Sequence, residues 1–271
     1  MSPYQQAYRT NTGKPLPAQA ATLEPLFAQI AAGEALPPRG QQAVTLGLTA
    51  HSLTDAKADP DLFEYYRWVI THCFAQKEIN ELTAKLIGMA FTSANIFQTD
   101  LPQPITLNPW QIDAMLTFPL ATKQAVVIEN NGVFALLHQR HPTWPLIVQS
   151  GNDFNPAYVQ LIQNLEQRGV AFTYIGDLDS RGIQMADHFF TQLQRTPIDV
   201  VTALQRPVDV AKWVALMGKP DPKRTRALTV QNAIYQQELN VIQLSEKFVE
   251  QEQLLAIYEA RIPQWLAENK S

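Results

Sequence analysis

Hydrophobic positions recur with different periods along the chain, and the changes of period divide it into three parts. Helical spacing of apolar side chains is clear in residues 21–36, 59–76 and 77–91. Residues 94–108 then indicate extended chain that is limited by prolines. We therefore predict a mostly helical N-terminal region over residues 1–117.

From residue 118 to residue 205, short continuous apolar runs alternate with helical segments. The runs are AVVIE (125–129), PLIVQS (145–150), FTYIGD (172–177) and IDVVTAL (198–204). Continuous runs of this kind are typical of strands that are buried on both faces. Alternating strands and helices form right-handed crossovers in a parallel sheet. We therefore predict an α/β domain over residues 118–205, with a mainly parallel four-stranded sheet flanked by helices. Residues 206–271 return to helical spacing and indicate a helical C-terminal extension.

The net charge limits how the chain could hold a charged partner. Its 21 lysines and arginines are outnumbered by 25 aspartates and glutamates, which gives a formal net charge of −4 at pH 7. A partner that carries phosphate would therefore have to meet a local basic patch. The densest basic segment is KPDPKRTR at residues 219–226, in which Lys223 and Arg224 are candidate substrate contacts. Solvated surface is the alternative explanation of this segment.

The cysteine content and the apolar runs indicate the compartment. Cys73 is the single cysteine, which excludes an internal disulfide and a cysteine-based zinc site. The start of the chain, MSPYQQAYRT, is polar, and no apolar run reaches the ~20 residues that a membrane span needs. We expect a cytoplasmic protein with neither a signal peptide nor a membrane span.

Acidic residues follow two of the predicted strands. Glu129 ends the run AVVIE, and Asp177 and Asp179 follow FTYIG. The carboxyl ends of parallel strands meet at one edge of a sheet, where three carboxylates would repel one another unless a cation neutralised them. Mg²⁺ or Mn²⁺ would serve, since hard divalent ions prefer carboxylate oxygens. Gly182 would let a substrate approach the start of the following helix.

Helix capping is the alternative explanation of the same motif. Asp179 and Ser180 are both good N-cap residues, and an acidic residue before a helix is favoured by the helix dipole without any metal ion. The motif DLDSRG alone does not decide between capping and metal binding.

The order of the motifs resembles the toprim domain of topoisomerases, bacterial primases and several nucleases. The resemblance rests on VVIENNGVFALL, PLIVQSGNDFNPAYVQLIQNLEQRG and YIGDLDSRGIQMA, and it covers residues 122 to 205. It is nearer to the branch that contains the topoisomerase VI A subunit and the JetD nuclease subunit of Wadjet plasmid-defence systems. The resemblance implies that Glu129, Asp177 and Asp179 bind Mg²⁺ and that Glu129 also acts as general acid or base.

Further positions within these motifs are candidate substrate contacts or departures from the branch. Gly151 follows the second predicted strand, as it does in this branch, and Arg181 lies within DLDSRG; we count both among the candidate substrate contacts. Ser180 and Arg181 replace an aromatic or aliphatic residue followed by proline or glycine, which bears on substrate preference. Glu250 and Glu252 are similar to a glutamate-rich segment near the end of JetD-like chains. The part before the sheet is shorter than in a full Wadjet nuclease subunit.

The resemblance implies a Mg²⁺-dependent DNA endonuclease in which a metal-bound water attacks the phosphodiester bond. The implied partners are DNA, the subunits of a condensin-like SMC complex, and a second copy of the chain in a homodimer. Two alternatives stay open. A topoisomerase VI-like tyrosine transesterase would use Tyr65 or Tyr66, and a toprim scaffold could also serve as an interaction module without catalysis.

Overall fold

The chain folds into two compact units, Met1–Gly88 and Met89–Ser271. The computed structural model describes residues 1–34, 36–37, 39–74, 89–149 and 154–268. Gly151 and most of the helix expected over residues 77–91 lie outside the described residues. None of the described helices combines the length and apolar character that crossing a membrane requires.

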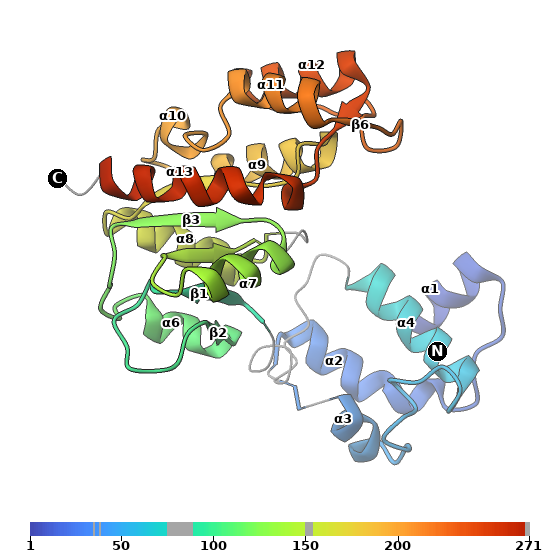
Figure 1. Cartoon of the computed structure of the whole chain (residues 1–271). Coiled ribbons are helices and arrows are strands. Elements are labelled where there is room, and N and C mark those ends of the chain that lie inside the picture. Colours follow the sequence, from blue (N-terminus) through green and yellow to red (C-terminus); the bar gives the residue numbers. More distant parts are fainter. Residues whose placement is uncertain (35, 38, 75–88, 150–153, 269–271) are drawn as a thin grey trace. The chain divides into compact units, whose positions relative to one another are not determined.

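The described part of the first unit is mainly helical (Figure 1). Its elements are α1 (Pro3–Thr12), η1 (Ala20–Leu23), α2 (Glu24–Ala32), α3 (Arg39–Thr45) and α4 (Pro60–Cys73). Helices α2 and α4 confirm the helical segments expected over residues 21–36 and 59–76. Tyr65 and Tyr66 of α4 are 0% and 1% exposed, so both side chains belong to the core of this unit.

A five-stranded sheet forms the centre of the second unit. The strands are β1 (Phe91–Ala94), β2 (Ile105–Leu107), β3 (Gln124–Ile128), β4 (Leu146–Val148) and β5 (Ala171–Ile175). Their order is β2-β1-β4-β3-β5, in which β3 is parallel to β4 and β5, and β1 is antiparallel to β4 and β2. AVVIE and FTYIGD supply parallel strands of one sheet, as predicted, and the structure shows that these strands are neighbours. The sheet as a whole is five-stranded and mixed, however, and not the mainly parallel four-stranded sheet that we expected.

The run IDVVTAL is helical, which corrects the fourth predicted strand. Helix α10 (Ile198–Val201) begins after Pro197, whose carbonyl oxygen accepts a hydrogen bond from the Val201 N–H at 3.1 Å. Ile198, Val201 and Leu204 are three positions apart, a spacing that also suits a helical turn. Val201 and Leu204 are buried, and the Val201 carbonyl accepts from the Thr173 hydroxyl of β5 at 3.1 Å. A helical turn therefore lies beside β5, where a further strand was expected.

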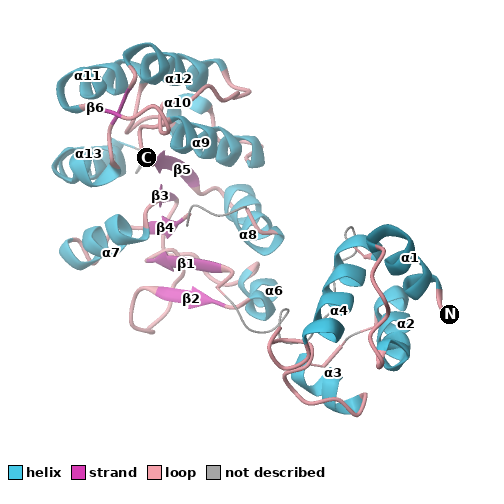
Figure 2. Cartoon of the chain, turned by 90° about the vertical axis from the view of Figure 1, so that its right-hand side faces the viewer, coloured by secondary structure: helices cyan, strands magenta, loops and turns pink. Residues whose placement is uncertain are grey.

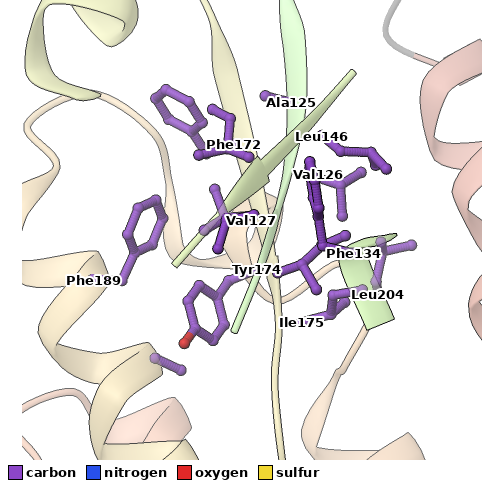
Figure 3. Packing of buried hydrophobic residues seen from close by; sticks show 14 of the residues in the cluster. Ala125, Val126, Val127, Phe134, Leu146, Phe172, Tyr174, Ile175, Phe189 and Leu204 are labelled. Carbon is purple, nitrogen blue, oxygen red and sulfur yellow. The ribbon is translucent and has the colours of Figure 1, made fainter. Parts of the chain in front are cut away.

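Helices cover both faces of the sheet. Figure 2 shows α7 (Asn131–Arg140) and α13 (Leu255–Glu268) on one face, and α6 (Ile112–Met115) and α8 (Pro156–Gln167) on the other. In Figure 3, Phe172 and Tyr174 of β5 face Phe189 of α9 (Ser180–Gln192), with ring centroids 6.0 and 5.3 Å from the Phe189 centroid. This double burial explains why the strands are continuous apolar runs.

The last part of the chain belongs to the same unit as the sheet. Its elements are α11 (Pro207–Met217), β6 (Lys219–Pro220), α12 (Ala233–Ser245), β7 (Lys247–Phe248), η3 (Gln251–Leu254) and α13. The short 3₁₀ helix η2 (Pro109–Gln111) lies earlier in the same unit and precedes α6. Trp213, Leu239 and Tyr258 from these helices share one hydrophobic core with the strands. Strands β1 and β2, which lie within the region expected to be helical, also belong to this unit. The change of period at residues 117 and 205 therefore marks a change of secondary structure within one compact unit.

Helix α13 packs into the same hydrophobic core as the sheet, so truncating one of its buried side chains should destabilise the second unit. Ile262 of α13 is 0% exposed, so Ile262→Ala should lower the free energy of unfolding of the second unit by about 2–5 kcal/mol, because it leaves a cavity in the core. Leu244→Ala on α12, at a side chain that is 87% exposed, should change it by less than about 0.5 kcal/mol. Urea denaturation of both variants measures this. Equal, small effects would show that α13 is not part of the folded core.

Candidate functional site

Two neighbouring parallel strands bring the predicted acidic residues to one edge of the sheet. Ile128 of β3 pairs with Ile175 of β5, and the Glu129 N–H donates to the Ile175 carbonyl at 3.1 Å. Gly176 then follows β5 directly against Glu129. A β-carbon at Gly176 would lie 2.4 Å from Glu129 Oε2, so a larger residue at 176 would displace the Glu129 side chain from this position.

Glu129 is partly buried at the end of β3, directly beside the backbone of Asp177. Its Oε2 accepts a hydrogen bond from the backbone N–H of Asp177 at 3.1 Å. Burial and, to a smaller extent, the Asp177 carboxylate raise the pKa of Glu129 to about 7, although this hydrogen bond opposes the shift. Glu129 can therefore take up or release a proton near neutral pH.

Asp177 and Asp179 share one cation, the guanidinium group of Arg224. Arg224 Nη2 donates to Asp177 Oδ2 at 2.6 Å, and Arg224 Nε donates to Asp179 Oδ2 at 2.7 Å. Burial raises the pKa of Asp177, while the backbone N–H of Gln251 and the charge of Arg224 oppose the rise. The two carboxylates are thus compensated by an arginine 47 and 45 residues further along the chain.

Asp179 is also the N-cap of α9. Its Oδ1 accepts from the Gly182 N–H at 2.7 Å, which confirms that the residue caps this helix. A β-carbon at Gly182 would lie 2.2 Å from the Asp177 carbonyl oxygen. The close approach that Gly182 permits is therefore made by the backbone of Asp177, and the expected contact with a substrate at Gly182 stays a prediction.

Arg224 is fixed from several sides. Its Nη1 donates to Glu250 Oε1 at 3.2 Å, and its guanidinium carbon lies 4.1 Å from the centre of the Phe248 ring. Lys219 Nζ bonds the other oxygen of Glu250 at 3.3 Å. Glu250 therefore joins the site through Arg224. Arg224 was predicted from the sequence as a substrate contact; its pairing with the acidic residues was not predicted.

Gln251 connects the ends of β3 and β5 and was missed entirely by the sequence analysis. This residue is 0% exposed. Its backbone N–H donates to Asp177 Oδ1 at 2.8 Å, and its side chain donates to the Ile175 carbonyl at 3.1 Å and accepts from the Asn130 N–H at 3.1 Å. Glu252 Oε1 accepts from Asn130 Nδ2 at 2.7 Å, which places Glu252 at the rim. Gln251 lies in the segment FVEQEQL, whose two glutamates are the residues that resemble JetD-like chains, and the sequence does not distinguish Gln251 from Gln253.

The side chain of Gln205 bonds the backbone just after β5, at the edge of the sheet where no further strand pairs with β5. Gln205 accepts from the Gly176 N–H at 3.0 Å and donates to the Gly176 carbonyl at 2.9 Å. It donates further to the Tyr258 hydroxyl of α13 at 2.8 Å. Both backbone groups of the turn before Asp177 are thereby satisfied, which holds that turn in place.

The remaining predicted contacts are exposed at the start of α9 and in the nearby loop. The Ser180 N–H donates to the Arg224 carbonyl at 2.9 Å, which ties the loop between β6 and α12 to this helix start. Arg181 and Lys223 have exposed side chains on these two segments. Solvent-facing cations therefore lie on both segments that meet at the acidic residues.

The carboxylate oxygens of Glu129, Asp177 and Asp179 are of the type that binds hard divalent ions. In this structure, however, Asp177 and Asp179 share the guanidinium group of Arg224. Among the described residues, no three Asp, Glu, His or Cys side chains are arranged so that they could hold one metal ion. Arg224 instead bonds Oδ2 of both Asp177 and Asp179. The positive charge beside these two carboxylates is therefore the guanidinium group.

More than half of the chain matches the model of a known family. The model of the family described as "Protein of unknown function C-terminus (DUF2399)" matches residues 105–248. This range contains the three predicted acidic residues and Arg224. Comparison with curated proteins gives no match.

The raised pKa of Glu129 predicts how stability depends on pH without metal. The folded chain holds this proton up to about pH 7, whereas the ordinary value is 4.5. The resulting stability is fully present below about pH 4.5 and is lost as the pH rises through 7. Thermal unfolding in EDTA should show that Glu129→Gln is more stable than wild type at pH 8, by on the order of 2–3 kcal/mol, and that the gain shrinks towards pH 4.5.

An exposed carboxylate provides the control for this measurement. Asp199→Asn should follow the wild-type curve at every pH, because Asp199 is solvent-exposed. Parallel curves for Glu129→Gln and wild type between pH 4.5 and 8 would contradict the raised pKa.

Proposed function

The chain belongs to the family described as protein of unknown function C-terminus (DUF2399), and we propose that it is a toprim-type, metal-dependent DNA endonuclease whose site is formed by Glu129, Asp177 and Asp179. One observation carries the proposal. Two carboxylates at the carboxyl edge of adjacent parallel strands share a single cation, directly beside a third carboxyl group that titrates near neutrality. Such a combination of like charges and a shifted pKa is typical of functional sites.

The three acidic residues take two roles in this proposal. Asp177 and Asp179 would hold Mg²⁺ or Mn²⁺ through their Oδ2 atoms. When bound, such an ion lowers the pKa of water and stabilises charge on a phosphoryl group. Glu129 sits behind Asp177 and would accept or return a proton at its carboxylate, for which a pKa of about 7 is suited at neutral pH.

The exposed cations at the start of α9 and in the loop between β6 and α12 would contact the DNA backbone. Arg181 on α9 and Lys223 on the loop flank the acidic residues, and their charges would offset the repulsion between carboxylates and phosphate. The formal net charge of −4 supports a reading in which partners deliver the DNA to this local patch. We propose that the partners are subunits of a condensin-like SMC complex and a second copy of the chain, as the resemblance to JetD implies.

An interaction module without catalysis is the second candidate, and the arginine favours it. If Arg224 compensates the carboxylates permanently, the site is a structural ion cluster. The tyrosine transesterase has less support, because Tyr65 and Tyr66 are buried in the core of the first unit.

Cleavage assays on circular and linear plasmid test the proposal. Asp177→Asn and Asp179→Asn keep the acceptors for the Gln251 and Gly182 N–H groups but lose the charge that holds a divalent ion. Each should reduce Mg²⁺- or Mn²⁺-dependent cleavage by at least about 100-fold, as expected for loss of a group that acts in the reaction. Asp199→Asn, which removes an exposed charge elsewhere, should cleave like wild type. Cleavage by wild type that persists in EDTA, or undiminished cleavage by both site variants, would contradict the assignment.

A further inference from the structure

Three acidic residues from two segments, the turn between β5 and α9 and the stretch after β7, converge on Arg224. Its Nη2 bonds Asp177 at 2.6 Å, its Nε bonds Asp179 at 2.7 Å and its Nη1 bonds Glu250 at 3.2 Å. All three guanidinium nitrogens are thus used, each by a different carboxylate. A planar, permanently charged group is suited to this task, because it cannot relieve the contact by losing a proton.

The four carboxylate oxygens of the two aspartates are not equally available to an ion. Asp177 Oδ1 accepts from the Gln251 N–H, and Asp179 Oδ1 accepts from the Gly182 N–H that begins α9. Releasing either of these would leave a backbone donor unpaired. The Oδ2 atoms bond only the Arg224 side chain among the hydrogen bonds described here, so they are the oxygens that can be exchanged without disturbing the backbone.

The surroundings of Arg224 offer its side chain a position away from these oxygens. Its side chain is 26% exposed, so one side of it reaches solvent. Glu250, which is 39% exposed, offers a carboxylate that can retain the guanidinium after both aspartates are released. The backbone stays anchored meanwhile, because the Arg224 carbonyl accepts from the Ser180 N–H at 2.9 Å. Movement of the side chain alone is sufficient.

We propose that Arg224 is a resident counter-ion that competes with a divalent cation for Asp177 and Asp179, so that metal binding requires the arginine to be displaced. This inference rests on the proposed metal-dependent function and adds a means of regulating metal binding. The chain would keep its acidic site folded without metal, and it would bind the ion more weakly than the carboxylates alone would allow. Arg224 is then an autoinhibitory contact within the site.

Mn²⁺ binding to Arg224→Met tests the competition directly. Methionine keeps an apolar stem over Phe248 but removes the charge. The free Mn²⁺ signal in electron paramagnetic resonance reports binding without any reaction. Arg224→Met should bind Mn²⁺ about 5- to 150-fold more tightly than wild type, the usual range for coupling between two sites. The variant should also melt at a lower temperature in EDTA and gain more from added Mn²⁺ than wild type does.

Lys219→Met is the matched control. Lys219 is a cation near Arg224 in the sequence, and its side chain bonds Glu250 but neither Asp177 nor Asp179. Its Mn²⁺ affinity should stay close to that of wild type. If Arg224→Met does not fold, Arg224→Lys provides the test. An ammonium group retains the charge but cannot bridge both aspartates as the guanidinium does, so it should give an intermediate gain in affinity.

The outcomes separate this inference from the proposed function. Tighter Mn²⁺ binding by Arg224→Met or Arg224→Lys, with Lys219→Met unchanged, supports displacement. Equal or weaker binding by both Arg224 variants, alongside measurable binding by wild type, overturns the competition and leaves the metal site intact. Absence of Mn²⁺ binding in wild type and folded Arg224 variants alike overturns the metal site itself, and the competition with it.

Discussion

Like charges that are partly buried together need a cation, and this constraint shapes the whole carboxyl edge of the sheet. Asp177 and Asp179 are 26% and 10% exposed at their side chains, too little for water alone to screen them. Removing one partner of a buried ion pair costs about 3–5 kcal/mol, against about 0–1 kcal/mol for an exposed pair. The site lies between these limits, and the loop that carries Arg224 is bound to the start of α9 where the compensation is needed.

The last part of the chain completes a site that the strands only begin. Leu178 and Val249 exchange backbone hydrogen bonds at 2.9 and 3.1 Å, which brings Glu250 and Gln251 to the acidic residues. Gln251 then satisfies groups from both strand ends, and Gln205 satisfies the turn at Gly176. Glycines at 176 and 182 permit the close approach of these segments. The helices after residue 206 are therefore part of the site's construction.

Local pattern explains which features could be predicted from the sequence. Strands β3 and β5 are continuous apolar runs ending in acidic residues, so their place in one parallel sheet and the position of Glu129, Asp177 and Asp179 at one edge followed from strand geometry. Their direct pairing did not follow from the sequence. The run at 198–204 suits a helical turn equally well, and β1 and β2 have only 4 and 3 residues, too few for a period. Arg224 and Gln251 pair with Asp177 across 47 and 74 residues, and no local pattern encodes such contacts.

The central claim is that a divalent ion binds Oδ2 of Asp177 and Asp179 in place of the Arg224 guanidinium. The most direct measurement is a crystal structure of the wild-type chain with Mn²⁺, in which anomalous scattering locates the ion. The account predicts a peak about 2.1 Å from Oδ2 of both Asp177 and Asp179, with the Arg224 side chain moved away from them. Arg224 still bonded to both aspartates at saturating Mn²⁺, with no peak between them, would contradict it.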